Sequence, residues 1–219
     1  MEKEITIAIV GGTGSLGRGL TLRLARPGIK VTVGSRDQNR AQQAADELNQ
    51  SLGKEFIEGK VNSEAIKAAE FIVIAVPYEG HEQMVRELGI GLKDKIVIDA
   101  VVPLRKGRPF VPAAGSALQE AQTIFGSEVP VVGAFHNISA VDLQDRDSSL
   151  GDVLVCGDSD AAKQKVMEII QKLGARAFDA GPAANAYVIE GLTGVLLYLN
   201  RKYKSKHATV KVTGIGKQD

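Results

Sequence analysis

The sequence contains no tryptophan, a single cysteine, and aromatic residues at only 5% of its 219 positions. So few aromatic rings argue against a platform on which the bases of a single-stranded nucleic acid could stack. The one cysteine, Cys156, has no partner with which to form a disulfide inside the chain, as is usual in a reducing compartment. Its position in the apolar segment 152–157 predicts a buried strand residue instead.

The sequence also lacks an excess of one charge and any long apolar run. The 27 basic and 26 acidic side chains leave a formal net charge of +1, which indicates neither a nucleic-acid-binding surface nor an acidic tail. No stretch approaches the roughly 18 to 20 uninterrupted apolar residues that a membrane span needs. The first residues lead into a strand pattern without the apolar segment of a signal peptide. We therefore expect a cytoplasmic protein that binds neither nucleic acid nor membrane.

What the sequence does contain is an alternation of short, β-branched apolar segments with segments of helical character. The apolar segments are continuous, as expected of strands that are covered by helices on both faces. The predicted strands are 5–10, 30–34, 71–76, 95–102 and 129–135, and the predicted helices are 14–26, 36–53, 63–70, 79–88 and 116–125. This order is typical of βαβ units and predicts a Rossmann-like, doubly wound and mostly parallel α/β sheet.

The pattern changes after residue 137. Two further predicted strands, 152–157 and 175–181, flank a predicted helix at 159–173, and they could extend the same sheet. A long apolar helix is predicted at 184–204 and an edge strand at 207–215. We interpret residues 1–181 as a dinucleotide-binding domain and 182–219 as a small C-terminal unit that packs on the ligand-binding edge of the sheet.

A cluster of glycines follows the first predicted strand and opens the first predicted helix. Gly12, Gly14 and Gly17 fit the motif G-x-G-x-x-G in the structural context that dinucleotide binding requires. In that motif the first glycine permits a tight turn, the second lets the backbone approach a pyrophosphate, and the third allows close helix packing. In such a site the pyrophosphate lies at the helix N-terminus. We therefore expect Thr13, Ser15 and Leu16, which lie between these glycines, to contact the cofactor as well.

The same segment fits a second template. Gly11, Gly14 and Gly17 have the G-x-x-G-x-x-G spacing of extended short-chain dehydrogenases, which also need a catalytic Tyr-x-x-x-Lys. The chain has that pattern at Tyr198 and Lys202, but in its last predicted helix, whereas that family has it in mid-chain. A tyrosine on a helix surface beside a solvated lysine is the simpler interpretation.

The end of the second predicted strand indicates which dinucleotide would bind. An NAD site usually has an acidic residue there, about twenty positions after the motif, to bind the ribose hydroxyls. This chain has Ser35 and Arg36, with Arg40 one helical turn later. An arginine binds a 2′-phosphate by charged hydrogen bonds, whereas a carboxylate would repel it. We therefore predict NADP(H), with its 2′-phosphate among Thr13, Ser35, Arg36 and Arg40, while Asp37 can supply a favourable charge at the helix start.

Ligands of such sheets bind at the carboxyl ends of the strands. There we expect Val76, Pro77 and Ala100 to line the nicotinamide side by backbone contacts. His136, followed by Asn137, should face the crevice, where an imidazole can donate a hydrogen bond or carry a proton. The sequence has no Ser/His/Asp order, no Cys/His pair and no metal-ligand spacing, so we expect no metal and assign the chemistry to hydride transfer by the cofactor.

Together, the segments "GGTGSLGRGL", "VGSR", "VVPL", "FHNI", "DAGP" and "IEGLT" resemble the NADPH-dependent reductases of coenzyme F420, an 8-hydroxy-5-deazaflavin carrier. The resemblance covers nearly the whole chain and implies reversible hydride transfer between NADP(H) and the deazaflavin ring. It also implies that His136 and Thr193 lie near that ring. Tyr187 and Gly191 depart from the archaeal pattern, where an arginine and a serine can occur. Their loss would weaken binding of the acceptor's polar or acidic tail, for which Arg201, Lys202 and Lys204 could compensate.

The residues alone leave two other functions open: NADPH-dependent reduction of a flavin, a quinone or a small imine or ketone, and a non-catalytic NADP-sensing module. An open slot bordered by Asp99, His136 and Thr193 would favour an enzyme, and a crevice filled by side chains would favour the sensor. We also expect a homodimer, because the last predicted helix is too apolar to leave uncovered; its apolar residues include Val195, Leu196, Leu197 and Leu199.

Overall fold

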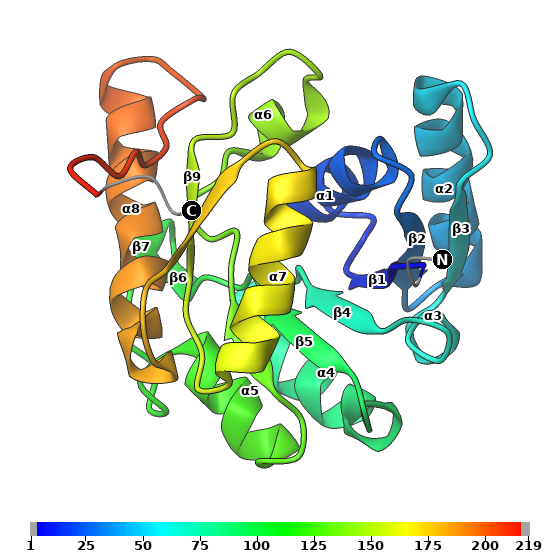
Figure 1. Cartoon of the computed structure of the whole chain (residues 1–219), viewed down its shortest axis with the longest axis horizontal. Helices are drawn as coiled ribbons and strands as arrows, with labels where there is room; N and C mark the ends of the chain where they lie inside the picture. The colour runs from blue at the N-terminus through cyan, green and yellow to red at the C-terminus, as the bar shows by residue number, and fades with distance from the viewer. Residues whose placement is uncertain (1–3, 216–219) are drawn as a thin grey trace.

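Six strands form a central sheet in the order β3-β2-β1-β4-β5-β8, and all of its pairings are parallel. The computed structural model describes residues 4–215 and is shown in Figure 1. The strands are β1 (Thr6–Val10), β2 (Lys30–Ser35), β3 (Ile57–Val61), β4 (Phe71–Ile74), β5 (Ile96–Asp99) and β8 (Val131–Gly133). The predicted doubly wound α/β fold is therefore confirmed.

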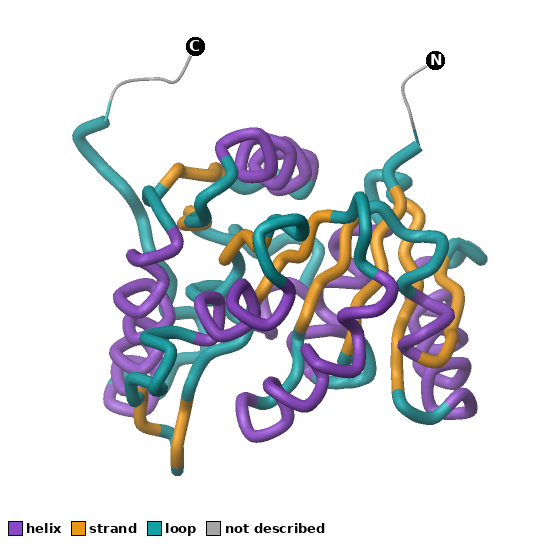
Figure 2. The backbone as a smooth tube through the Cα atoms, turned by 90° about the horizontal axis from the view of Figure 1, so that it is seen from below, coloured by secondary structure: helices purple, strands orange, loops and turns teal. Residues whose placement is uncertain are grey.

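Helices cover both faces of this sheet, as the tube view also shows (Figure 2). One face is covered by α1 (Ser15–Ala25), α2 (Gln38–Leu52) and α7 (Asp160–Lys172), and the other by α3 (Asn62–Ala65), α4 (His81–Leu88) and α5 (Ala117–Phe125). Within β1, Ile7 and Ile9 belong to the first apolar cluster, and Ala8 and Val10 to the second. Since both faces are buried, strands of this sheet need an unbroken apolar sequence.

The strand order places a topological switch beside β1. From β1 the chain builds β2 and β3 on one side, then crosses to build β4, β5 and β8 on the other. Such a reversal opens a crevice at the carboxyl ends of the two strands that meet there. The glycine cluster follows β1, and residues 75–77 follow β4, so both segments lie at this crevice.

The expectation that the later strands extend the central sheet is wrong. β9 (Asp152–Val155) and β10 (Arg176–Asp179) form a separate parallel pair, which touches β8 through an antiparallel bridge between Gly133 and Cys156. A parallel continuation would need a full crossover helix, but the connection from β8 contains only the short α6 (Ala140–Gln144), which packs on α1. Cys156 is fully buried, as predicted.

Three shorter elements also differ from expectation. β3 was missed because Glu58 and Lys60 interrupt the apolar pattern of an edge strand that is buried on one side only. The helix expected at 63–70 is limited to the four residues of α3. The edge strand expected at 207–215 is absent from the described residues: that segment is irregular, and it lies beside β9 through bonds from Asp152 N to Val210 O (2.9 Å) and from Val212 N to Asp152 Oδ2 (2.6 Å).

The last helix, α8 (Ala186–Lys202), lies at the end of the molecule opposite α2 (Figure 1). It follows a short 3₁₀ turn, η3 (Ala183–Asn185), and its first half packs on the sheet through Ala186 and Ile189. The two-residue strands β6 (Leu104–Arg105) and β7 (Arg108–Pro109) form a hairpin whose β7 side contacts α8. The proposed boundary between residues 181 and 182 stays a prediction.

Candidate functional site

Glycines shape the turn between β1 and α1, because the backbone there packs too closely to leave room for side chains. Gly11 has a left-handed φ of 80°, and a Cβ there would lie 2.5 Å from the Ala75 carbonyl oxygen. A Cβ on Gly17 would lie 2.5 Å from the Gly11 carbonyl oxygen, so α1 packs directly against the turn. The tight backbone conformation thus belongs to Gly11, one residue before the position that the motif suggested.

The N-terminus of α1 is open to an anion. Its cap residue, Gly14, makes no side-chain cap hydrogen bond, and the first turn has no acidic residue. The first N–H groups of a helix have no partner inside the helix, and they carry the positive end of its dipole. Thr13, Ser15, Leu16 and Gly17 therefore stand where the sequence expected a pyrophosphate, although that contact stays a prediction.

A cavity of ≈320 Å³ lies beside this turn and contains all four residues expected around a 2′-phosphate. We call it the arginine pocket; its lining includes Gly11, Thr13, Ser35, Arg36, Asp37, Arg40, Asn62, Val76 and Pro77. Asp37 caps α2, since its Oδ1 accepts from Arg40 N at 2.9 Å. Neither guanidinium forms an ion pair with any residue in the described range 4–215. Two free cations therefore face the pocket, while its one carboxylate is engaged by the helix.

Asn62 belongs to this pocket and was missed by sequence analysis. Its Nδ2 lies 3.5 Å from the Met84 sulfur, and its buried Oδ1 has no hydrogen-bond partner within residues 4–215. A buried polar atom without a partner is costly, so this oxygen is suited to a ligand that donates a hydrogen bond. No signal pointed to Asn62, because the strand that precedes it was itself not predicted.

A second and wider cavity of ≈1020 Å³ opens on the other side of residues 75–77. We call it the slot. It is lined by the expected residues Ser15, Leu16, Val76, Pro77, Ala100, His136, Asn137 and Thr193, and by residues of α8 such as Leu196 and Leu197. Ala75, Val76 and Pro77 line both cavities. The two cavities therefore adjoin at the segment after β4; the arginine pocket is also bordered by the glycine turn, and the slot by the start of α1.

His136 lines the slot and is only 4% exposed. Neither of its ring nitrogens has a hydrogen-bond partner among residues 4–215. Burial lowers the pKa of His136 from 6.5 to about 4, against a smaller opposing effect of Asp99, so the imidazole is neutral at pH 7. The preceding residue, Phe135, has a left-handed φ of 69°, a strained conformation for a bulky side chain. The histidine thus offers one unused donor and one unused acceptor.

Thr193 and Asn137 support the end of β8 from two sides. Thr193 Oγ1 donates to the His136 carbonyl oxygen at 2.7 Å, which ties α8 to the histidine segment. Asn137 Nδ2 donates to the Asp152 carbonyl oxygen at 2.6 Å, and the Asn137 Oδ1 has no partner among the described residues. Both residues line the slot as expected, and the structure adds that their hydrogen bonds hold His136 in position.

Asp99 does not border the slot, contrary to expectation. It is fully buried on the opposite face of the sheet, where its Oδ2 lies 2.8 Å from Nε2 of His81. Nδ1 of His81 lies 2.7 Å from Glu120, whose other oxygen accepts from Tyr78 Oη at 2.9 Å. Strand alternation explains the error, because Asp99 shares its face with the core residues Val97 and Val101.

This buried row of hydrogen bonds gives His81 a structural role that its position in the sequence did not suggest. Burial alone would lower the pKa of His81, but hydrogen bonds and charges from Asp99 and Glu120 raise it to about 9. His81 is therefore an imidazolium at pH 7. Together with the bond from Val101 N to Asp99 Oδ1 (2.9 Å), it connects the segment after β4 to the segment after β5, which form one wall of the slot.

The Tyr-x-x-x-Lys alternative is not supported by the position of its tyrosine. Tyr198 is 55% exposed on α8 and does not line the slot or the arginine pocket. It lies with Lys202 along a cleft beside the β6–β7 hairpin, which adjoins the slot at Gly107 and Arg201. A catalytic tyrosine would have to reach the nicotinamide side of the crevice.

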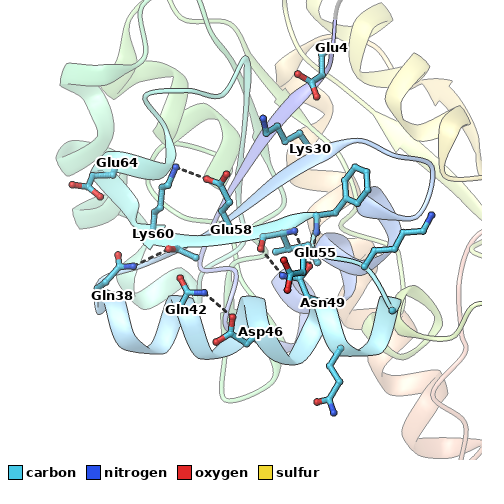
Figure 3. Close-up of a pocket in the computed structure, with 16 residues that line it drawn as sticks. Glu4, Lys30, Gln38, Gln42, Asp46, Asn49, Glu55, Glu58, Lys60 and Glu64 are labelled. Atoms are coloured by element: carbon cyan, nitrogen blue, oxygen red, sulfur yellow. Dashed lines mark hydrogen bonds and ion pairs between the residues drawn. The ribbon is translucent and has the colours of Figure 1, made fainter.

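A further hollow of ≈1530 Å³ lies at the outer edge of the sheet, between α2 and β3 (Figure 3). Several of its polar side chains are engaged with one another or with backbone: Gln42 bonds Asp46, Lys60 pairs with Glu58, and Asn49 donates to the Ile57 carbonyl oxygen. Gln38 bridges Gly59 O and Val61 N in the same way. The bonds of Asn49 and Gln38 join α2 to β3, so we interpret this hollow as a structural seam.

The described residues offer no metal centre: between residues 4 and 215, no three His, Cys, Asp or Glu side chains are placed to hold an ion. Over the same residues, no helix combines the length and the apolar character needed to cross a membrane.

The sequence matches a family of known proteins. Residues 6–103 match the family described as NADP oxidoreductase, coenzyme F420-dependent. The chain is 35% identical to an F420-dependent NADP reductase of Methanocaldococcus jannaschii, over 95% of this chain and 98% of the relative. It is 33% identical to an F420-dependent NADP reductase of Methanothermobacter thermautotrophicus, over 97% of each chain.

The fold is similar to that of a solved hypothetical protein from Sinorhizobium meliloti. The TM-score is 0.69 at 20% sequence identity, and the alignment covers 84% of this chain and 88% of the other. At this identity the likeness speaks for the Rossmann-like fold alone.

Proposed function

The chain belongs to the family of F420-dependent NADP reductases, and from this premise we propose that it transfers a hydride reversibly between NADP(H) and coenzyme F420. One observation carries the proposal: the arginine pocket and the slot share a wall made of Ala75, Val76 and Pro77. A dinucleotide that crosses this wall has its 2′-phosphate end on one side and its nicotinamide on the other, in front of the acceptor.

The residues of the arginine pocket fit NADP(H). Arg36 and Arg40 would bind the 2′-phosphate, since Asp37 is engaged as the cap of α2. The unpartnered Asn62 Oδ1 can accept a hydrogen bond from the adenosine half. The open N-terminus of α1, with the close packing at Gly11 and Gly17, would hold the pyrophosphate. The 2′-phosphate, the adenosine half and the pyrophosphate would thus each meet a complementary group in this chain.

The slot fits a broad ring with a few polar edges. NADPH supplies the hydride, and the deazaflavin ring accepts it without further help from a metal or a covalent group. The apolar side chains of Leu196, Leu197 and Val102 exclude water from the space in which the two rings would stack. The neutral His136 can orient a ring carbonyl or ring nitrogen by a hydrogen bond, and Thr193 holds the backbone of that histidine. We propose His136 as an acceptor-orienting residue.

We also propose a cytoplasmic protein that works as a homodimer. Support for the dimer comes from α8, where Tyr187, Val188 and Val195 are each more than half exposed. An apolar surface of this kind is typical of an interface. We predict a dimer mass by light scattering at micromolar concentration, and a single monomeric species would refute it.

The test of the proposed reaction is NADPH oxidation with F420, FMN and a quinone offered separately to the purified protein. We expect turnover with F420 that exceeds turnover with the other two acceptors. No turnover with F420 beside clear turnover with FMN would overturn the assignment and favour a flavin reductase.

A further inference from the structure

The slot does not end at Thr193 but continues into a second, positively charged cleft. This cleft of ≈670 Å³ lies between the β6–β7 hairpin and α8. We call it the cationic groove; it is lined by Gly107, Arg108, Pro109, Gly194, Tyr198, Arg201 and Lys202. Gly107 and Arg201 line both the slot and the cationic groove. A ligand that fills the slot can therefore extend past Arg201 into the groove without leaving the protein surface.

The groove has a defined shape because the hairpin rests directly on α8. A Cβ at Gly194 would collide with the Pro109 ring, so a larger residue there would push the hairpin away. The hairpin tip at Gly107 is held next to Arg201 by this contact. The two walls come from segments about 90 residues apart in the chain, which is why the sequence did not place Arg108 near Arg201 and Lys202.

The charges in and around the groove are all of one sign. Arg108, Arg201 and Lys202 line the groove, and Lys204 and Lys206 line the adjoining part of the slot. No aspartate or glutamate lines either cavity. Among residues 4–215, none of these five cations forms an ion pair, whereas Arg18, Lys60, Arg86 and Arg176 elsewhere on the surface each pair with a carboxylate.

The helix dipole accounts for only part of this cluster. Basic residues are favourable in the last turn of a helix, which explains Arg201 and Lys202 at the end of α8. It does not explain Arg108, which comes from the hairpin, or Lys204 and Lys206, which follow the helix. Lys204 is held at a left-handed φ of 52°, in a turn closed by the bond from Ser205 N to Asn200 O (2.9 Å). Glycine is the usual residue at this position of a helix end. A lysine there adopts an unfavourable backbone conformation, which the end of the helix alone does not explain.

We propose that the cationic groove, together with Lys204 and Lys206, is a binding subsite for the anionic tail of the deazaflavin co-substrate, which carries a phosphodiester and glutamate carboxylates. The inference rests on the proposed function, since it concerns the same acceptor. The ring would occupy the apolar slot, and the tail would follow the line from Arg201 towards Arg108 and Lys202. Opposite charges in a partly enclosed cleft favour such a ligand over a neutral one, and added salt would weaken this preference.

The test is equilibrium binding of two ligands to the full-length protein in the presence of NADP+, followed by deazaflavin fluorescence. One ligand is F420, and the other is the same deazaflavin without its phosphate and glutamates. We expect the wild-type protein to bind F420 more tightly, and we expect salt to remove most of that difference. A deazaflavin truncated after the phosphate separates the contribution of the phosphate from that of the carboxylates.

Two variants carry the test. Lys204→Gly removes a charge at a position that favours glycine, so it should leave the melting temperature unchanged or raise it while weakening F420 binding by about 2- to 5-fold. The triple variant Arg108→Gln, Arg201→Gln, Lys202→Gln should weaken F420 binding by about 10-fold or more. Both variants should weaken the binding of F420 more than that of the tail-less deazaflavin, which lacks the anionic groups. Lys67→Gln, which removes an exposed charge between α3 and β4 that lines neither the slot nor the groove, is the matched control and should change neither affinity.

Two results would overturn the subsite while leaving the proposed function intact. One is a wild-type protein that binds the tail-less deazaflavin as tightly as F420, and the other is an equal loss of both affinities in the triple variant. A wild-type protein that binds NADP+ but neither deazaflavin would instead overturn the proposed function, and the subsite with it.

Discussion

Replacing Arg36 by alanine should reduce the preference of this protein for NADPH over NADH. Arg36 lines the arginine pocket, and within the described residues its guanidinium has neither a hydrogen bond nor an ion pair to lose. The substitution should therefore change the free energy of unfolding by less than about 0.5 kcal/mol. The substitution should weaken the binding of NADPH but not that of NADH, because NADH lacks the 2′-phosphate.

The size of the effect follows from the exposure of the arginine. A hydrogen bond to a charged group contributes about 1.5 to 3 kcal/mol, and water screens an exposed group such as Arg36, so the lower end of this range applies. A loss of about 1.5 kcal/mol raises the Kd for NADPH by about 10-fold. The Kd for NADH should not change, and Arg36→Ala with Arg40→Ala should remove nearly all of the preference.

The assay is titration of the protein with NADPH and with NADH, followed by the fluorescence of the reduced nicotinamide. Arg86→Ala is the control, since Arg86 is also exposed but lies on α4 and pairs with Glu82. An unchanged Kd for NADPH in Arg36→Ala would refute the assignment of the pocket. Equal losses for both dinucleotides would also refute it, because they would indicate a general disturbance of the crevice.

Three further predictions concern His81, His136 and Thr193. The pKa of His81 is raised from 6.5 to about 9, so its stabilising contribution is complete below pH 6.5 and is lost as the pH rises through 9. In urea unfolding, the difference between wild type and His81→Gln should therefore shrink by roughly 3 kcal/mol over that range, and a constant difference would count against a charged His81. His136→Phe should raise the KM for the deazaflavin by about 2- to 10-fold without changing the Kd for NADPH, and an equal rise in both would refute an orienting role. Thr193→Val should lower the free energy of unfolding by about 0.5 to 1.5 kcal/mol through loss of the bond to the His136 carbonyl, whereas an unchanged value would mean that this bond contributes nothing net.

A row of hydrogen bonds runs from Tyr78 through Glu120 and His81 to Asp99, and it explains why the wall of the slot formed after β4 and β5 is ordered. It crosses from α5 to α4 and then to the end of β5, and it is buried at its centre. An imidazolium between two carboxylates satisfies groups that would otherwise be costly to bury. The sequence could not indicate this, since His81 and Glu120 lie in helices whose relative placement depends on the sheet between them.

The parts of the site that were predictable are those in which sequence neighbours stay neighbours. The glycine turn, Ser35 with Arg36, and Arg40 one turn later are each local, and their spacing fits a strand-to-helix unit. The same applies to the alternation of apolar segments, which identified most strands and helices. β3 was the exception, because an edge strand with one exposed face has no continuous apolar run.

Other features could be seen only when distant segments were brought together. Asn62 enters the arginine pocket through β3, and Asp99 turns away from the slot because of its register in β5. The segment at 207–215 alternates like a strand, but it bonds to β9 only through the backbone and side chain of Asp152 and does not form a regular strand pairing. Alternation determines which side of a strand is apolar, whereas pairing requires a free edge in the correct place.

By itself, the sequence determined the doubly wound α/β fold and the motif for a phosphate-bearing dinucleotide, because both depend on short-range periodicity and on residues a few positions apart. Only the tertiary structure decided which side chains share a cavity. It joined the arginine pocket to the slot through Ala75, Val76 and Pro77, buried His136 with both nitrogens free, and set Arg108 beside Arg201. Which residues lie together depends on how helices and strands pack across the whole chain, and no local sequence pattern encodes that packing.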